Sequence, residues 1–364
     1  MTASQGELQR TPLYELHRES GAKFAPFAGY EMPVQYPSGI LGEHSHTRSA
    51  AGLFDVSHMG QVTLSGPAAA AGLEALMPID VIGLGVGRQR YALFTNDDGG
   101  ILDDLMVTNL GDRLFLVVNA ACKAADIAHL QANLPDDCAL EVLADRALLA
   151  LQGPAAASVL ARFAPETATQ AFMTAGEVEI EGAACLVSRS GYSGEDGYEI
   201  SLPAEAAEAI ARRLLAEEEV APVGLGARDS LRLEAGLCLY GADLDETTTP
   251  VEAGLTWALS KARRADGARP GGYPGDAVIL EQLAEGAPRR RVGLRPEGRA
   301  PVRGGAELVD DTGRPVGSVT SGGFGPTVGG PVAMGYLETA LAEEGTAVNA
   351  LVRGKAHAMR VTRL

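Results

Sequence analysis

The chain has 364 residues, of which 46% are hydrophobic and 21% are charged, and its formal net charge is −17. So acidic a chain is poorly suited to nucleic acid or an anionic membrane as its main partner, and no apolar run reaches the roughly 18 residues that a membrane span requires. Because the length exceeds what one hydrophobic core usually organises, two or three domains are expected.

The N-terminal segment and the cysteines bear on location. Met1–Glu7 has neither a basic region nor an apolar segment, so we expect neither a secretory signal nor a transit peptide. The four cysteines lack the spacing of metal ligands and are expected to be free thiols in a reducing compartment. They are Cys122, Cys138, Cys185 and Cys238. We therefore expect a location in the bacterial cytoplasm.

The first half of the chain alternates predicted helices and strands. Short helices are expected at residues 11–21 and 43–51, and residues 53–148 are rich in strand patterns, with helices near 66–77 and 120–134. This β-α-β-β-α-β rhythm is compatible with a ferredoxin-like unit. The expected fold class is α+β.

Two adjacent aspartates, Asp103 and Asp104, lie inside the apolar run 101–107. Strand geometry sends neighbouring side chains to opposite faces, so one aspartate shares the face of Leu102 and Met106. A carboxylate on a buried face costs several kcal/mol unless it has partners or a function. The pair therefore marks a candidate site.

A hairpin is predicted just before this pair. Residues 90–95 have a strand pattern, Asn96–Gly99 is a polar turn, and the return strand starts at Gly100. If Thr95 pairs with Gly100, Tyr91 lies opposite Asp104. A phenol facing a carboxylate at the edge of a pocket is the arrangement expected of a functional site.

A glycine-rich turn at residues 191–197 leads into a strand that contains Glu199. Alternation places Glu199 on the opposite face from its two neighbours. From the residues alone, an exposed strand carboxylate is the main expectation. The alternative is a buried glutamate that accepts two adjacent N–H donors, such as those of a pterin or a guanidine-like group.

Residues 224–236 are predicted to form a helix with Gly236 as its C-terminal cap. Arg228 and Arg232 are four residues apart and share one face of this helix. Arg228 is expected in a surface ion pair, with bidentate binding of a carboxylate as the alternative. We expect no metal site, because His44 and His46 point apart on a helix and have no further clustered ligand, and His58 is expected to be a satisfied core histidine.

From Pro288 onward, short strand patterns alternate with Gly/Pro turns, which predicts a small β-barrel or sandwich. Residues 258–303 contain ten basic and five acidic side chains. This segment is expected either to face an acidic protein or anionic ligand or to be a solvated basic surface.

Ten segments, in this order and spacing, are typical of one family. They are Thr11–Tyr14, Phe27–Tyr30, Met32–Tyr36, Gly52–Met59, Gly99–Asp104, Gly191–Ile200, Gly226–Gly236, Leu239–Gly241, Thr249–Glu252 and Val319–Gly323. Over nearly its whole length the chain resembles the T-protein of the glycine cleavage system, an aminomethyltransferase.

The resemblance implies a three-domain cloverleaf around a central folate channel. The first domain would combine residues 1–52 with 140–240, and the second, a ferredoxin-like β-rich insertion, would combine 53–139 with 241–275. Residues 276–364 would form the third domain, a C-terminal β-barrel.

The resemblance also implies the reaction. The enzyme would take the aminomethyl group from the lipoyl arm of H-protein, pass the carbon to tetrahydrofolate and release ammonia, without a metal or redox cofactor. Two other functions remain as alternatives, a tetrahydrofolate-dependent demethylase and a folate-binding scaffold of iron–sulfur cluster maintenance.

Residue by residue, Asp104 matches the catalytic aspartate of the family. Glu199 matches the residue that takes the donor edge of the pterin, and Arg228 matches a folate-binding arginine. The remaining matches are expected to line the folate channel: Tyr91, Met106, Asn119, Tyr192, Tyr240 and Trp257.

Two further expectations concern the C-terminal third. The family offers a late tyrosine to the folate, whereas this sequence ends Val361-Thr362-Arg363-Leu364, so we expect that contact to be replaced or the folate tail to be held more loosely. The basic region between Arg263 and Arg303 is the expected docking site for acidic H-protein, with charge reversal at Arg289–Arg291 as its test.

Overall fold

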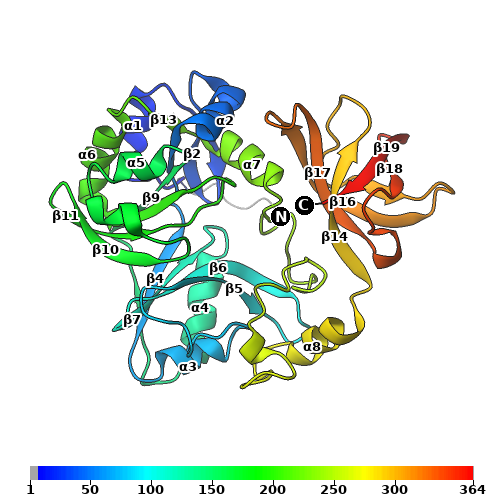
Figure 1. Cartoon of the computed structure of the whole chain (residues 1–364), viewed down its shortest axis with the longest axis horizontal. Helices are drawn as coiled ribbons and strands as arrows, with labels where there is room; N and C mark the ends of the chain where they lie inside the picture. Colours follow the sequence, from blue (N-terminus) through cyan, green and yellow to red (C-terminus); the bar gives the residue numbers. More distant parts are fainter. Residues whose placement is uncertain (1–6, 364) are drawn as a thin grey trace.

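Three lobes surround a common centre in the computed structural model, which describes residues 7–363 (Figure 1). The first and second lobes are each built on a sheet, and the third is a closed barrel. The expectation about a targeting segment falls mainly on residues 1–6, which lie outside the described residues, as does Leu364. No helix within residues 7–363 is long and apolar enough to cross a membrane.

The first lobe contains a six-stranded sheet in the order β10-β11-β12-β9-β3-β13. Its strands are β3 (Ala51–Asp55), β9 (Arg146–Gln152), β10 (Ala175–Ile180), β11 (Ala183–Ser188), β12 (Gly197–Pro203) and β13 (Val220–Val223). A separate hairpin consists of β1 (Lys23–Phe27) and β2 (Tyr30–Gln35).

Helices cover both faces of the first sheet. Apolar residues of α1 (Tyr14–Glu19), α5 (Ala156–Leu160) and α6 (Ala204–Leu215) pack with the strands into one core. On the other face, α7 (Leu225–Glu234) shares a second core with β3 and β9 and with strand β7 (Arg113–Val118) of the second lobe. This second core joins two lobes, so it fixes α7 at the centre of the molecule. This lobe also contains α2 (Gly39–Ser49) and the 3₁₀ turn η1 (Pro165–Thr169).

The second lobe contains a five-stranded antiparallel sheet in the order β5-β6-β7-β4-β8. Its elements are β4 (Gly60–Ser65), α3 (Ala69–Glu74), β5 (Gln89–Thr95), β6 (Ile101–Asn109), β7 (Arg113–Val118), α4 (Lys123–Asn133) and β8 (Ala139–Val142). The chain order therefore has one strand more than the predicted β-α-β-β-α-β rhythm. Both helices pack against one face of the sheet, and the segment around residues 238–258 packs against the other.

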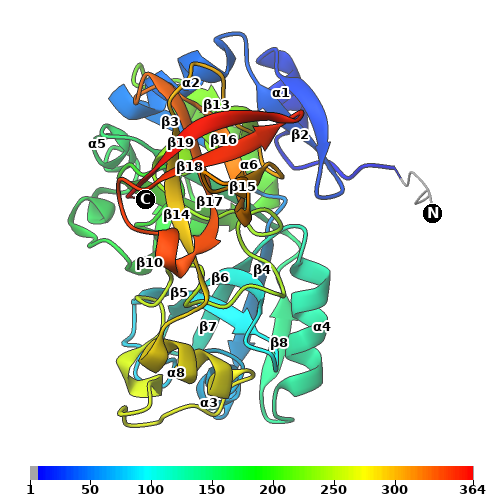
Figure 2. The same ribbon diagram turned by 90° about the vertical axis from the view of Figure 1, so that its right-hand side faces the viewer.

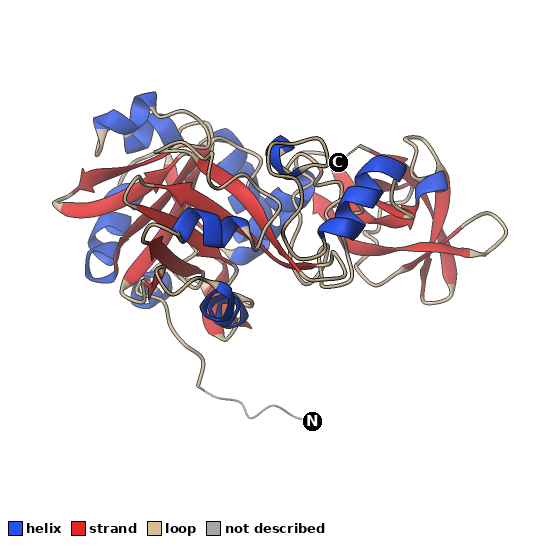
Figure 3. Ribbon diagram, turned by 90° about the horizontal axis from the view of Figure 1, so that it is seen from below, coloured by secondary structure: helices blue, strands red, loops and turns tan. Residues whose placement is uncertain are grey.

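The third lobe is a barrel that closes in the order β14-β17-β16-β15-β18-β19. Its strands are β14 (Arg289–Pro296), β15 (Glu307–Val309), β16 (Pro315–Gly325), β17 (Gly330–Glu338), β18 (Ala347–Val352) and β19 (Lys355–Thr362), with the 3₁₀ turn η3 (Thr339–Leu341) after β17. Short strands forming a small barrel or sandwich were expected from Pro288 onward, so the predicted barrel is confirmed. Viewed from below, loops link the barrel to the sheets of the other lobes (Figure 3).

The sheets place the lobe boundaries a few residues later than the resemblance suggested. Strand β3 ends at Asp55 and belongs to the first sheet, and β8 extends the second sheet to Val142. Helix α8 (Asp276–Glu285) packs through Ile279 on Leu259 and Tyr273 rather than on the barrel. Figures 1 and 2 accordingly show α8 beside the second lobe. The 3₁₀ turn η2 (Lys261–Arg263) precedes it.

Candidate functional site

A cavity of about 1650 Å³ lies where the three lobes meet. Its walls include Asp104 from the second sheet, Glu199 from the first sheet, Arg228 from α7 and Thr320 from the barrel. All nine residues that the sequence singled out line this one cavity: Tyr91, Asp104, Met106, Asn119, Tyr192, Glu199, Arg228, Tyr240 and Trp257. Their individual roles remain predictions.

The hairpin that carries Asp104 differs in register from the expected one. Thr95 pairs with Ile101 and Leu93 with Asp104, while Tyr91 pairs with Met106. The turn accounts for one residue of the shift, because Thr95 pairs with Ile101 instead of Gly100. A bulge at Leu102 adds the second, because this residue has no partner between the Phe94–Asp103 and Thr95–Ile101 pairs. The predicted pairing of Tyr91 with Asp104 was therefore wrong. The two side chains still meet, since Asp104 is the diagonal neighbour of Tyr91 on the same face.

Two neutral donors hold the Asp104 carboxylate at the cavity wall. The Tyr91 hydroxyl donates to Oδ2 at 3.0 Å, and Asn119 Nδ2 donates to Oδ1 at 2.9 Å. Burial, together with the nearby Asp103 carboxylate, raises the pKa of Asp104 to about 7. Burial and Asp104 also raise the pKa of Tyr91 far above its usual value, so its hydroxyl stays protonated and donates. Asp104 is thus a positioned carboxyl group whose pKa suits proton transfer near neutral pH.

Asp103 lies on the opposite face and has no solvent exposure. It accepts hydrogen bonds from the Asn119 backbone N–H at 3.1 Å and from Asn119 Nδ2 at 2.9 Å. Asp103 is therefore a buried, hydrogen-bonded carboxylate and not a solvated one. Asn119 links both aspartates, so it fixes the distance between the two charges.

Glu199 and Arg228 form part of another wall of the cavity. The Arg228 guanidinium lies 4.7 Å from the centre of the Tyr192 ring. Burial raises the pKa of Glu199, while Arg228 and a hydrogen bond from Ser190 oppose that rise. The expectations of an exposed strand carboxylate and a surface ion pair were wrong. Both groups face the interior because the inner face of this sheet meets α7, which a single strand pattern does not reveal.

The aromatic residues lie along the rest of the cavity. The rings of Tyr91 and Trp257 are 5.2 Å apart, and 65% of Trp257 is exposed. Tyr240 donates its hydroxyl to the carbonyl of Ile101 at 3.1 Å, and Tyr192 donates to the carbonyl of Cys238. Trp257 therefore stands where the cavity opens to solvent, next to Tyr91, which is hydrogen-bonded to Asp104.

The position of His58 differs from the one expected from the sequence. It is 3% exposed and buried as expected, but it lines the cavity and its Nδ1 has no hydrogen-bond partner within residues 7–363. Burial, with Arg228 and Lys123 nearby, lowers the pKa of His58 to about 4. It is therefore a neutral wall residue rather than a satisfied core histidine. The sequence places His58 just after a buried strand, but it does not show that another lobe lies opposite this residue.

All four cysteines are free thiols, as expected from the sequence. Among residues 7–363 there is no group of three or more His, Cys, Asp or Glu side chains arranged to hold a metal ion. His44 instead bonds to Ser230 and Glu234.

Two family descriptions match the chain. The GCVT N-terminal domain matches residues 13–263, and the glycine cleavage T-protein C-terminal barrel domain matches residues 289–364. The chain is 44% identical to the mitochondrial aminomethyltransferase of Dictyostelium discoideum, over 97% of this chain and 91% of that protein. It is also 44% identical to the probable mitochondrial aminomethyltransferase of Schizosaccharomyces pombe, over 100% of this chain and 94% of that protein.

One solved structure agrees with these family matches. The crystal structure of glycine cleavage system aminomethyltransferase T from Bartonella henselae matches with a TM-score of 0.92 and 47% identity, over 98% of both chains. These likenesses cover the whole fold, including all three lobes and the cavity between them. The chain therefore belongs to the glycine cleavage T-protein family and is a tetrahydrofolate-dependent aminomethyltransferase.

Proposed function

We propose that the central cavity is the folate channel and that Asp104 is the catalytic group within it. The observation that carries this proposal is a half-buried carboxyl group, held by Tyr91 and Asn119 and with a pKa near 7, in the same cavity as Glu199 and Arg228. The one-carbon unit comes from the aminomethyl group on the lipoyl arm of H-protein. The products are 5,10-methylenetetrahydrofolate, ammonia and H-protein with a dihydrolipoyl arm.

The residues present fit tetrahydrofolate. Glu199 can accept the adjacent N–H donors of a pterin, and Arg228 provides a cation beside it. The cavity volume of about 1650 Å³ exceeds the roughly 300–1,000 Å³ of an ordinary ligand pocket. This leaves room for the lipoyl arm beside the folate.

Asp104 supplies the proton transfer that this reaction requires. Two new bonds join the carbon to folate nitrogens, while its bonds to the amine nitrogen and the lipoyl sulfur break. The two protons lost from the folate nitrogens end on ammonia and on the thiol. Asp104 accepts a proton at this place, and Tyr91 and Asn119 keep its carboxylate oriented.

Trp257 provides a direct test of folate binding. It is the only tryptophan of the chain and it lines the cavity. Titration with tetrahydrofolate is expected to change its fluorescence in a saturable manner, and Glu199→Gln is expected to weaken binding by about tenfold, as expected for the loss of a charged hydrogen-bond acceptor. Saturable quenching with the same Kd in wild type and Glu199→Gln would contradict the placement of the pterin.

The mouth of the cavity has a basic rim, which consists of Arg88, Arg90, Lys261 and Arg264. None of the four forms an ion pair within residues 7–363. Phe172 lines the same cavity and is 68% exposed. A basic rim around an exposed aromatic group suits an acidic protein that inserts a lipoyl arm. We infer that H-protein docks on this rim.

This site differs from the predicted docking region. Arg291 is buried and donates to the carbonyls of Ala253 and Gly236, and Arg289 pairs with Glu252 at 3.1 Å. Charge reversal at Arg289–Arg291 would therefore damage the packing between lobes. Lys261 and Arg264 are the part of the predicted basic segment that reaches the rim.

Arg88→Glu is expected to raise the KM for H-protein by roughly 3- to 10-fold at low salt, because it reverses one charge of the rim. The KM for tetrahydrofolate should stay unchanged. Arg295→Glu is the matched control, since Arg295 is exposed on barrel strand β14 and lies outside the cavity. Equal H-protein KM values for the two variants would exclude the rim as the docking surface, and a selective rise in folate KM would assign it to the folate tail.

We also propose that the protein acts in the cytoplasm. The four free cysteines support a reducing compartment. The related proteins of Dictyostelium discoideum and Schizosaccharomyces pombe are described as mitochondrial. Cell fractionation followed by immunodetection decides between the two locations.

A further inference from the structure

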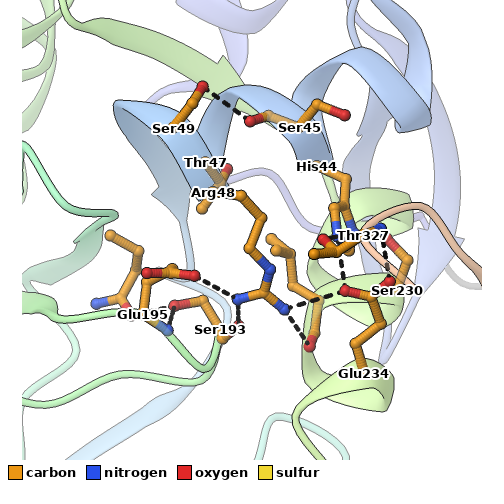
Figure 4. A network of polar contacts seen from close by, with 12 residues as sticks. His44, Ser45, Thr47, Arg48, Ser49, Ser193, Glu195, Ser230, Glu234 and Thr327 are labelled. Atoms are coloured by element: carbon orange, nitrogen blue, oxygen red, sulfur yellow. Dashed lines mark hydrogen bonds and ion pairs between the residues drawn. The ribbon is translucent and has the colours of Figure 1, made fainter. Parts of the chain in front are cut away.

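A second polar network lies behind the folate-facing side of α7, and none of its members lines the cavity. We define the interdomain clasp as His44, Arg48 and Glu234 with the groups that they bond (Figure 4). His44 and Arg48 belong to α2, and Glu234 is the last residue of α7. Because the clasp residues touch no cavity surface, any effect that they have on folate must act through the elements that they hold.

Glu234 attaches the barrel to α7. Its side chain is 4% exposed, and Oε1 accepts the backbone N–H groups of Thr327 at 2.9 Å and Val328 at 3.2 Å. Both donors lie in the loop between β16 and β17. Gly325 permits this approach, because a Cβ there would lie 2.7 Å from Glu234 Oε1.

Arg48 attaches the glycine-rich turn to the same helix. Its Nη1 donates to the carbonyl of Ser193 at 2.7 Å and to Glu195 Oε1 at 2.9 Å, and its Nη2 donates to the carbonyl of Leu231 at 3.3 Å. Ser193 directly follows Tyr192, which lines the cavity. The guanidinium thus holds the Tyr192 turn and α7 at a fixed separation.

His44 completes the clasp. Its side chain has no exposure, and its ring nitrogens contact Ser230 Oγ at 2.7 Å and Glu234 Oε2 at 3.0 Å. Nε2 also lies 3.1 Å from Thr327 Oγ1. One histidine therefore contacts α7 at two points and the barrel loop at a third.

The three elements joined here all supply cavity wall. The turn carries Tyr192, α7 carries Arg228, and β16 carries Thr320 and Ser321. We propose that the interdomain clasp positions these three walls for tetrahydrofolate, so that His44, Arg48 and Glu234 are positioning residues for folate binding. This inference rests on the proposed function of the cavity as the folate channel.

Glu234→Gln tests the proposal, because it keeps the shape of the side chain and removes the charge that His44, Arg48 Nη2 at 3.4 Å and the two loop amides share. The Kd for tetrahydrofolate, measured by Trp257 fluorescence, is expected to rise about tenfold, as expected for weakened hydrogen bonds to a charged group. The kcat at saturating folate should stay within about twofold, since Asp104 and its partners are untouched. Glu338→Gln is the matched control, because Glu338 pairs with Arg314 on the barrel surface and lies outside the cavity.

Three outcomes are distinguishable. If wild type does not bind tetrahydrofolate, the proposed function of the cavity fails and the clasp inference with it. If wild type binds and a folded Glu234→Gln has the same Kd, the clasp is only structural and the inference is overturned. A rise in Kd in Glu234→Gln, absent from Glu338→Gln, supports it.

If Glu234→Gln does not fold, hydrogen exchange of the wild-type enzyme decides. Binding and clasp closure must strengthen each other reciprocally. Saturating tetrahydrofolate is therefore expected to slow exchange of the Thr327 and Val328 amides severalfold, with no change at the Gly313 turn of the barrel. Unchanged exchange at Thr327 and Val328 would overturn the inference.

Discussion

Replacement of Asp104 by asparagine is expected to lower kcat for aminomethyl transfer by about 10²- to 10⁴-fold, the usual contribution of a general acid–base group. The folate KM should change by less than about threefold, because asparagine preserves the size of the side chain and Glu199 and Arg228 still hold the pterin. The physical reason is the loss of a proton acceptor that Tyr91 and Asn119 hold in place. Formation of 5,10-methylenetetrahydrofolate from aminomethyl-loaded H-protein measures the effect.

The same assignment fixes the pH dependence. Asp104 must be ionised to accept a proton, and its pKa is about 7, so kcat should fall as the pH decreases through that value. The Asp103 charge contributes to that raised pKa, so Asp103→Asn should move the acidic limb to lower pH. Asp97→Asn, in the exposed turn of the same hairpin, is the control and should match wild type. An unaltered kcat in Asp104→Asn would remove Asp104 from the mechanism.

Asp243→Asn is expected to destabilise the protein by up to about 3–5 kcal/mol, the cost of removing one partner of a buried ion pair. Asp243 has a fully buried carboxylate, and its Oδ2 accepts Arg232 Nη1 at 2.6 Å and Ser321 Oγ at 2.9 Å. Asp243 therefore joins α7 to barrel strand β16, and its loss leaves the buried Arg232 charge with only the exposed carboxylate of Asp229, at 2.8 Å, as its ion-pair partner. Urea unfolding followed by circular dichroism measures the change.

A surface ion pair provides the contrast to Asp243. Arg314 and Glu338 pair on the exterior of the barrel, where their side chains are 53% and 45% exposed. Arg314→Gln should leave the unfolding midpoint nearly unchanged, because water solvates both charges once they separate. If Asp243→Asn unfolded at the same urea concentration as Arg314→Gln, the buried pair would contribute nothing to the attachment of the barrel.

Local patterns were sufficient where one strand or helix buries one face. Short strand patterns between Gly/Pro turns predicted a small barrel or sandwich, and six strands form a closed barrel in this region. Alternation also identified Asp104 as the residue that shares a face with Met106, which the cavity lining agrees with. Helix α7 ends as expected before Gly236, whose φ of +70° suits glycine.

Features that depend on partners distant in sequence were missed. The bulge at Leu102 shifts the hairpin by one residue, and no turn residue reports it. Glu199 and Arg228 were expected at the surface because the pattern of one element cannot show that another lobe covers it. The same limit explains why the burial of Arg291 was not expected, since its partners Ala253 and Gly236 lie 38 and 55 residues earlier in the chain.

The resemblance supplied what the residues alone left open. From the residues alone, an exposed carboxylate was the main expectation for Glu199, and only the match to the family favoured a ligand-binding role. The structure then brings that residue and Asp104 into one cavity, although they lie in different sheets. Neither a demethylase nor a scaffold is favoured by the related proteins described above, whose names are those of aminomethyltransferases.

The most direct test of the central claim is ammonia release from aminomethyl-loaded H-protein, measured for wild type and Asp104→Asn with and without tetrahydrofolate. Wild type is expected to release ammonia rapidly and only with tetrahydrofolate, and Asp104→Asn is expected to lose about 10²-fold or more of this folate-dependent rate. Equal folate-dependent rates in the two proteins, or no folate-dependent release by wild type, would contradict it.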